Sequence, residues 1–165
     1  MKRNCLLLIT IIIISILNSC EIKSADEYYS SAASKTSLKA SILINCQTAV
    51  DYKDSKREKA DILKKTEIGF NKGETVFDAL KRACKNNKIQ LEFKGDGESV
   101  YVEGIDYLYE FDCGSLSGWE YSVNGEFPSV GCNAYELKEN DEISWLYTCE
   151  LGADIGDRYE GAEND

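Results

Sequence analysis

Residues 75–87, TVFDALKRACKNN, decide the fold class because they predict one amphipathic helix in a chain otherwise rich in strand patterns. Thr75 is suited to cap this helix, and Asp78 three residues on completes an acidic variant of the capping box. Lys81 and Lys85 lie toward the C-terminal end, where the helix dipole favours cations. The apolar side chains fall on one stripe with helical spacing: Val76, Phe77, Leu80, Ala83 and Cys84.

Alternating apolar residues predict strands on both sides of this helix. Before it, the pattern covers residues 41–48 and a short run at 68–70; after it, the pattern recurs at 88–93, 99–102, 107–113, 119–123 and 143–149. Asn124-Gly125 then predicts a two-residue hairpin turn, because both positions of that turn need positive φ. One helix across one face of a mixed sheet is an α+β arrangement. In order of elements, β-grasp is the closest named fold.

The N-terminal segment has the pattern of a signal peptide. Lys2 and Arg3 precede an apolar run over residues 5–17, which is shorter than the roughly 20 residues of a membrane-spanning helix. Leu17-Asn18-Ser19-Cys20 resembles the bacterial lipobox, which implies cleavage before Cys20 and a diacylglycerol group on its sulfur. Two acyl chains suffice for stable anchoring. We therefore expect an exported protein, lipid-anchored at Cys20 to the outer face of the bacterial cytoplasmic membrane or to the cell surface.

Composition divides the chain into four parts. Residues 1–19 form the lipoprotein signal peptide, residues 20–38 a flexible tether rich in Ser, Ala and charge, residues 39–152 the globular domain, and residues 153–165 an acidic tail. The chain carries 19 basic and 29 acidic residues, for a formal net charge of −10. Such a surface repels nucleic acid, so no nucleic-acid function is expected.

Five cysteines follow Cys20, and export favours disulfides among them. An odd number leaves one thiol free or paired between molecules. Cys113 and Cys132 are the pair that we expect to be bridged; a bond there closes a loop of 18 intervening residues, worth roughly 3 kcal/mol. The alternative is that the thiols stay reduced and pack as small hydrophobes. The disulfide candidates are Cys46, Cys84, Cys113, Cys132 and Cys149.

The absence of histidine from the chain restricts the chemistry. It excludes Ser-His-Asp and Cys-His nucleophiles and removes the usual proton shuttle at neutral pH. The cysteines are too widely spaced for a zinc site, so we expect no metal and no required cofactor. A carboxylate-based hydrolase of cell-wall glycans stays open, but no two acidic residues stand out as its pair. We therefore expect a protein that is not an enzyme.

Aromatic residues gather around the predicted hairpin at 119–125. Tryptophan and tyrosine combine an apolar body with a polar atom and are common at binding surfaces. The alternative is that Trp119 and Trp145 belong to the core. The candidate ligand-binding residues are Trp119, Tyr121, Asn124, Phe127 and Tyr135.

A longer pattern contains this hairpin. The segment GWEYSVNG at residues 118–125 is followed by Pro128-Ser129-Val130-Gly131, Asp141 and Trp145-Leu146-Tyr147-Thr148. This pattern resembles a bacterial domain-of-unknown-function family related to the C-terminal β-domain of transcobalamin and intrinsic factor. The resemblance covers about residues 40–152 and implies a β-grasp-like fold in an exported, often lipid-anchored protein. In the vitamin carriers the domain closes over cobalamin held by a helical domain. No segment of this chain resembles that helical domain, so no individual ligand contact is implied.

Three functions follow as expectations. The first is a surface-anchored, non-enzymatic ligand-binding module for a cobalamin-type corrinoid or another small molecule, together with an extracellular partner protein that completes the site. The second is an adhesive or structural module that binds a protein through the Trp119 hairpin or by strand addition. The third and weakest is the hydrolase. A concave aromatic pocket, a flat apolar patch or open sheet edge, and a carboxylate pair in a cleft distinguish the three.

Overall fold

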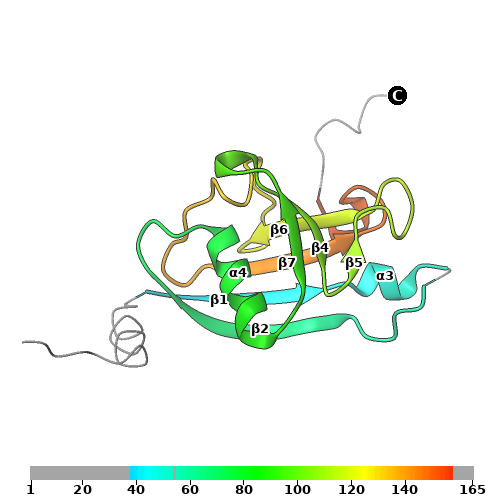
Figure 1. Ribbon diagram of the computed structural model, residues 1–165, viewed down its shortest axis with the longest axis horizontal. Coiled ribbons are helices and arrows are strands. Elements are labelled where there is room, and N and C mark those ends of the chain that lie inside the picture. The colour runs from blue at the N-terminus through cyan, green and yellow to red at the C-terminus, as the bar shows by residue number, and fades with distance from the viewer. Residues whose placement is uncertain (1–37, 54, 158–165) are drawn as a thin grey trace, which may run out of the picture. The chain divides into compact units, whose positions relative to one another are not determined.

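The computed structural model describes residues 38–53 and 55–157 (Figure 1). The predicted signal peptide, the lipidation site Cys20 and nearly all of the predicted tether lie outside the described residues, as do residues 158–165 of the predicted tail. Within the described part of the chain, no helix is both long and apolar enough to cross a membrane. Two sheets and one main helix make up this part, which confirms the α+β class.

The larger sheet is mixed and has four strands. These are β1 (Leu38–Asn45), β2 (Asp61–Phe70), β6 (Gly118–Val123) and β7 (Glu142–Thr148), in the order β2-β1-β7-β6. Strands β1 and β7 run parallel in the middle, whereas β1–β2 and β6–β7 are antiparallel. This is the strand arrangement of a β-grasp. Alternate residues of the two central strands are buried on one face: Ala40, Ile42 and Ile44 from β1, and Ile143, Trp145 and Tyr147 from β7.

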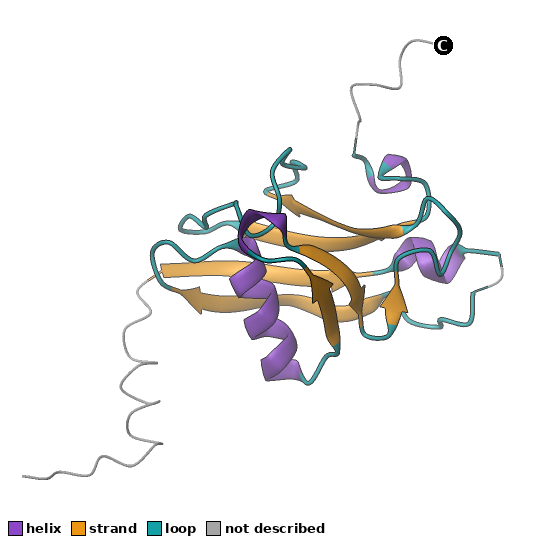
Figure 2. Cartoon of the chain, turned by 45° about the horizontal axis from the view of Figure 1, so that its top comes forward, coloured by secondary structure: helices purple, strands orange, loops and turns teal. Residues whose placement is uncertain are grey.

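Helix α4 (Val76–Asn87) crosses the buried face of this sheet (Figure 2). Its capping box forms as predicted: the Asp78 N–H donates to Thr75 Oγ1 (3.2 Å), and the Thr75 N–H donates to Asp78 Oδ2 (3.0 Å). The helix ends at Lys88, which adopts the left-handed conformation. The predicted apolar stripe is buried along its whole length.

A smaller antiparallel sheet covers the rest of that face. It consists of β3 (Leu91–Lys94), β4 (Tyr101–Ile105) and β5 (Leu108–Tyr109). Three short helices complete the described elements: α3 (Gln47–Asp51), η1 (Gly97–Ser99) and η2 (Ala153–Ile155). The strand predicted at 107–113 was wrong beyond Tyr109. The chain turns there because Phe111 has a positive φ of 69° and the Tyr109 N–H donates to Asp112 Oδ2 (2.8 Å).

The hairpin turn predicted at Asn124-Gly125 is present, with φ of 55° and 84°. Val123 and Glu126 close it with two backbone hydrogen bonds of 2.9 and 3.0 Å. The antiparallel pairing across this turn is limited to one isolated bridge, between Val123 and Glu126. The long-range partner of β6 is β7 rather than a strand directly after the turn.

The predicted Cys113–Cys132 disulfide is wrong, because all five cysteines of the described residues are free thiols. Cys113 lies in the turn after β5, where its N–H donates to Ser117 Oγ (3.1 Å). Cys132 instead lies against β4, with its Sγ 4.0 Å from the Val100 carbonyl oxygen. Four thiols are buried and pack as small apolar groups, namely Cys46, Cys84, Cys113 and Cys132; Cys149 is half-buried.

Candidate functional site

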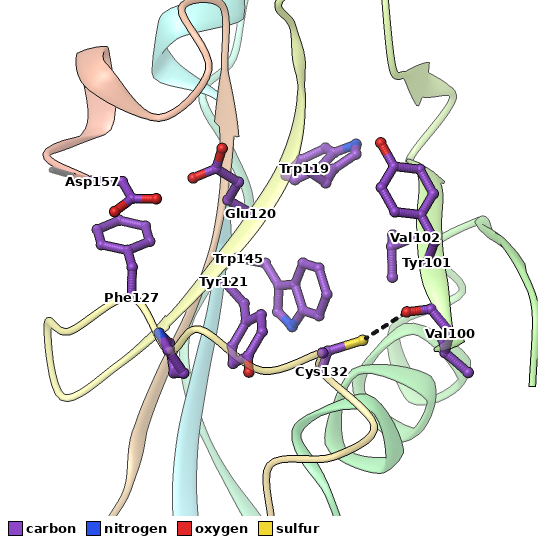
Figure 3. Close-up of a pocket in the computed structure, with 12 residues that line it drawn as sticks. Val100, Tyr101, Val102, Trp119, Glu120, Tyr121, Phe127, Cys132, Trp145 and Asp157 are labelled. Atoms are coloured by element: carbon purple, nitrogen blue, oxygen red, sulfur yellow. Dashed lines mark hydrogen bonds between the residues drawn. The ribbon is translucent and has the colours of Figure 1, made fainter. Parts of the chain in front are cut away.

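A cavity of about 280 Å³ opens beside the edge strand β6. Figure 3 shows it between β6, the start of β4 and the loop 127–132. Aromatic side chains from all three segments, and one from β7 behind them, make up much of its wall: Tyr101, Trp119, Tyr121, Phe127 and Trp145. The cavity is therefore concave and mainly apolar, which is the usual character of a small-molecule site.

Strand register places the central rings. Trp119 pairs with Tyr147, and Tyr121 pairs with Trp145, so these four side chains share the buried face of the sheet. The Trp119 and Tyr147 rings meet edge to face at 5.2 Å, and those of Tyr121 and Trp145 are 5.6 Å apart. Such aromatic pairs stabilise beyond the area they bury. They hold this wall of the cavity rigid.

Hydrogen bonds fix two of these side chains further. Trp119 Nε1 donates to the Leu108 carbonyl oxygen (2.8 Å), and the Tyr121 hydroxyl donates to the Val130 carbonyl oxygen (2.7 Å). The second bond ties the loop 127–132 to β6. Trp119 is thus a core residue with 6% of its surface exposed, and it also borders the cavity.

The structure brings together three of the five predicted ligand-binding residues. Trp119, Tyr121 and Phe127 line the cavity. Asn124 holds the hairpin turn instead: its side chain donates to Asp141 Oδ1 (2.9 Å) and accepts from the Glu142 N–H (2.9 Å). Tyr135 packs edge-on against the Tyr121 ring at 6.4 Å and does not line the cavity.

Trp145 contributes a polar atom that the sequence did not reveal. Only 2% of its surface is exposed, and Nε1 is buried with no hydrogen-bond partner among the described residues. Buried N–H groups are nearly always paired, and leaving one unpaired costs about 1–3 kcal/mol. In Figure 3 the indole lies in the middle of the cavity, with Nε1 toward Tyr121 and Cys132. The cavity therefore contains a hydrogen-bond donor in need of an acceptor.

A carboxylate pair lies at another end of the cavity. Glu120 follows Trp119 along β6 and points to the opposite face, so the cavity continues around the edge of the strand to Glu120 and Asp157. Both carboxyl groups rest on Gly152. A Cβ built there would lie 2.9 Å from Glu120 Oε2 and 3.2 Å from Asp157 Oδ2. Gly152, with a φ of 89°, leaves room for them.

This environment changes the protonation of Glu120. Its Oε2 atom is buried, and no N–H or O–H group of the described residues donates to it. Burial is the main cause that raises the pKa of Glu120 to about 7; the negative charge of Asp157, a carboxyl hydrogen bond to Asp157 and the charge of Asp154 add to it. None of the ion pairs formed by described residues engages Glu120 or Asp157.

Two other acidic residues of this region, Glu103 and Glu110, are paired with a cation. Lys94 Nζ lies 2.9 Å from Glu103 and 3.5 Å from Glu110, and the Tyr101 hydroxyl donates to Glu110 Oε2 (2.6 Å). Burial and that hydrogen bond raise the pKa of Tyr101 to about 12. Among the described residues no group of three or more His, Cys, Asp or Glu side chains could hold a metal ion. Glu120 and Asp157, by contrast, line the cavity without an ion pair to any of the described residues.

The fold and the cavity define a β-grasp domain with a cavity lined by aromatic side chains. Residues 73–148 match the model of a family described as Domain of unknown function (DUF4430). This match confirms the resemblance to a domain-of-unknown-function family that the motif at residues 118–125 predicted. Among curated proteins, no sequence matches this chain.

Two solved structures are similar to the chain at low identity. One is a protein from Ruminococcus gnavus ATCC 29149 described as a candidate metal binding protein (8% identity, TM-score 0.45), with 67% of this chain and 96% of that chain covered. The other is haptocorrin in complex with Cbi (16% identity, TM-score 0.46), with 68% of this chain and 26% of haptocorrin covered. This chain therefore spans about a quarter of the haptocorrin chain.

Proposed function

We propose that this protein is an exported, lipid-anchored binding module that holds a small ligand in the cavity beside β6 without transforming it. The observation that carries the proposal is the buried Nε1 of Trp145, which has no hydrogen-bond partner among the described residues and lies in an aromatic cavity. A ligand carbonyl or carboxylate that accepts from this N–H recovers the cost of burying it. The surrounding rings supply apolar contact area at little entropic cost, because the fold already fixes them.

The size of the cavity limits how a corrinoid would bind. At about 280 Å³ it lies at the lower end of ligand pockets, which run from about 300 to 1,000 Å³. A whole corrinoid is too large for that space, so only a substituent of it would enter. The rest of the ligand would lie outside, where an extracellular partner protein would cover it.

The acidic residues favour binding over hydrolysis. A glycosidase needs two carboxyl groups on either side of the sugar bond that it breaks. Glu120 and Asp157 instead pack on the same glycine, and Glu120 Oε2 is buried. The chain contains no histidine to act as proton shuttle.

Lipid anchoring rests on residues 17–20 and has its own test. In a bacterial host fed an alkyne-labelled fatty acid, the full chain should become labelled and fractionate with membranes. Cys20→Ser should remove the label. An unlabelled wild-type protein would contradict the anchor and leave the cavity proposal untouched.

The binding proposal is tested by titrating the chain without its signal peptide with cobalamin and cobinamide. Both tryptophans of the chain, Trp119 and Trp145, line the cavity, so Trp fluorescence reports on this site alone. Saturable quenching should weaken about tenfold in Trp145→Phe, which keeps a ring but removes the N–H. Tyr107→Phe is the control, since Tyr107 is 74% exposed and outside the cavity. No quenching by either corrinoid up to about 1 mM, an affinity of only about 4 kcal/mol, would remove corrinoids as ligands.

A specific surface favours protein binding as the second candidate function. Large apolar side chains of the turn after β5 and of the segment after β7 are exposed: Phe111, Leu116 and Leu151 at 62%, 52% and 59%. Leu116 and Leu151 are linked through a backbone hydrogen bond of 3.0 Å, so they lie together. Strand addition at β2 is disfavoured, because this edge strand exposes Lys64, Lys65 and Glu67.

A further inference from the structure

We propose that the ligand of this cavity is a small organic cation, with its positive group at Glu120 and Asp157 and its body against the aromatic rings. This inference rests on the proposed function and adds the chemical class of the ligand. It starts from the carboxyl groups of Glu120 and Asp157, which both lie close to Gly152. Neither group has a cationic partner among the described residues.

Without a ligand, the close approach of the Glu120 and Asp157 carboxyl groups costs free energy. Two carboxylates side by side repel each other, and burial penalises the charge on Glu120 further. A positive group placed between them would neutralise the repulsion. The formal charge of −10 for the whole chain also attracts cations over long range.

The lining of the cavity suits an organic cation better than a metal ion. Ca²⁺ takes six to eight oxygen ligands, and the described residues offer no group of three or more suitable side chains here. In addition to the carboxylates, aromatic rings line the cavity, including those of Phe127 and Tyr101. The faces of such rings attract ammonium groups. Figure 3 shows Phe127 at the same side of the cavity as Glu120 and Asp157.

A hydrogen-bond donor lies in another part of the cavity. Trp145 Nε1 is buried, unpartnered among the described residues and directed toward the Cys132 side rather than toward the carboxylates. The ligand must therefore also carry a hydrogen-bond acceptor. A cation with a carbonyl or ester group a few bonds away satisfies both ends of the cavity.

The test compares acetylcholine with 3,3-dimethylbutyl acetate, which differ only by the replacement of the charged nitrogen with carbon. Both carry an ester acceptor, and both are small enough for a cavity of about 280 Å³. The protein without its signal peptide is titrated at pH 8 by Trp fluorescence and by the NMR signal of the Trp145 indole N–H. Acetylcholine should bind at least about tenfold more tightly than its neutral analogue, and the Trp145 N–H signal should shift.

Three variants locate the effect. Glu120→Gln and Asp157→Asn should each reduce acetylcholine binding toward that of the neutral ester. Glu126→Gln is the matched control. Glu126 is an exposed acidic residue directly after the Asn124-Gly125 turn, and it does not line the cavity. Thermal unfolding of each variant verifies that it is folded.

Three results would overturn the inference. Equal binding of the two esters would show that the cavity takes ligands but does not select for charge, so the proposed function would survive. No binding of acetylcholine up to about 10 mM would also overturn it, while the corrinoid titration continues to report on the proposed function by itself. Loss of binding in Glu126→Gln as large as in Glu120→Gln would point to overall charge rather than to this site.

Discussion

At the scale of single residues, Glu120 links the stability of the protein to pH. Its pKa rises to about 7 in the folded protein from a usual value of 4.5. The folded state therefore holds the proton more tightly than the unfolded state does. The stability contributed by this group is complete below pH 4.5 and is lost as the pH rises from 4.5 toward 7.

Glu120→Gln should remove that dependence. At pH 8 the variant should be more stable than the wild type by about 1–2 kcal/mol, a figure that allows for the solvent that screens a half-buried group. At pH 4 the two proteins should be equally stable. Urea unfolding at both pH values measures the difference, and comparison between the proteins cancels all other titrating groups. A gap of the same size at both pH values would contradict the raised pKa.

Gly152 and Gly156 form a natural pair for testing the carboxylate site. Both have a φ of 89°, but a Cβ on Gly156 would meet nothing within 4 Å, whereas on Gly152 it would lie 2.8 Å from Asp157 Cβ. Gly156→Ala should cost about 1 kcal/mol from backbone strain alone. Gly152→Ala should cost about 1–3 kcal/mol more from overpacking. Chemical unfolding of both variants measures this, and equal losses would mean that the carboxyl groups move aside freely.

Sequence reasoning identified part of the candidate site. Trp119 and Tyr121 could be predicted because strand alternation puts them on one face. Phe127 could be predicted because it comes shortly after the Asn124-Gly125 turn that ends this strand. Trp145 was expected in the core, where it is, but its missing hydrogen-bond partner depends on which carbonyl oxygens the tertiary fold brings near. The Glu120–Asp157 pair depends on how the chain turns after β7. No local pattern encodes that path.

At the scale of elements, the N-terminus of α4 supports the cavity wall. The Val76 N–H donates to the Tyr135 carbonyl oxygen (3.1 Å), and the Phe77 N–H donates to the Cys132 carbonyl oxygen (3.0 Å). These bonds satisfy two of the unpaired donors of the first helical turn. They also fix the end of the loop 127–132. Helix capping and cavity shape are therefore coupled.

Thr75→Ala should weaken both the cap of α4 and the attachment of the loop 127–132 to the helix. Loss of the cap should lower the free energy of unfolding by about 0.5–2 kcal/mol, and hydrogen exchange of the Phe77 amide should accelerate. Thr66→Ala is the control, since Thr66 is exposed on the edge strand β2. Urea unfolding and amide exchange by NMR provide the measurements. Unchanged exchange at Phe77 in Thr75→Ala would separate the cap from the loop.

Elements with local signals were predicted well. The capping residues of α4 and the Asn124-Gly125 turn determine their structure within a few positions of the chain. By contrast, β2 covers residues 61–70, although only 68–70 were predicted as strand, because residues 64–67 (KKTE) face solvent on an edge and show no alternation. The parallel pairing of β1 with β7 joins residues about 100 positions apart. No local sequence pattern encodes a pairing over that separation.

At the scale of the whole molecule, the core alone holds the described domain together. One apolar cluster includes residues from α4 and from both sheets. Cys46, Cys84, Cys113 and Cys132 are part of it as reduced side chains. Burial raises the pKa of the Cys84 thiol to about 12 and that of Cys132 to about 11, so neither forms the reactive thiolate at neutral pH.

A reductant should therefore leave the stability of the protein unchanged. We expect the same melting temperature with and without dithiothreitol, because no cross-link restrains the unfolded chain. Iodoacetamide should modify all five thiols of the domain in denaturant, and in the native protein it should react first with Cys149, which is half-buried. Mass spectrometry of the chain purified without reductant counts the labels. A mass lower by about two hydrogens, together with a melting temperature that falls by several degrees in dithiothreitol, would mean that a disulfide forms and that the domain needs it for stability.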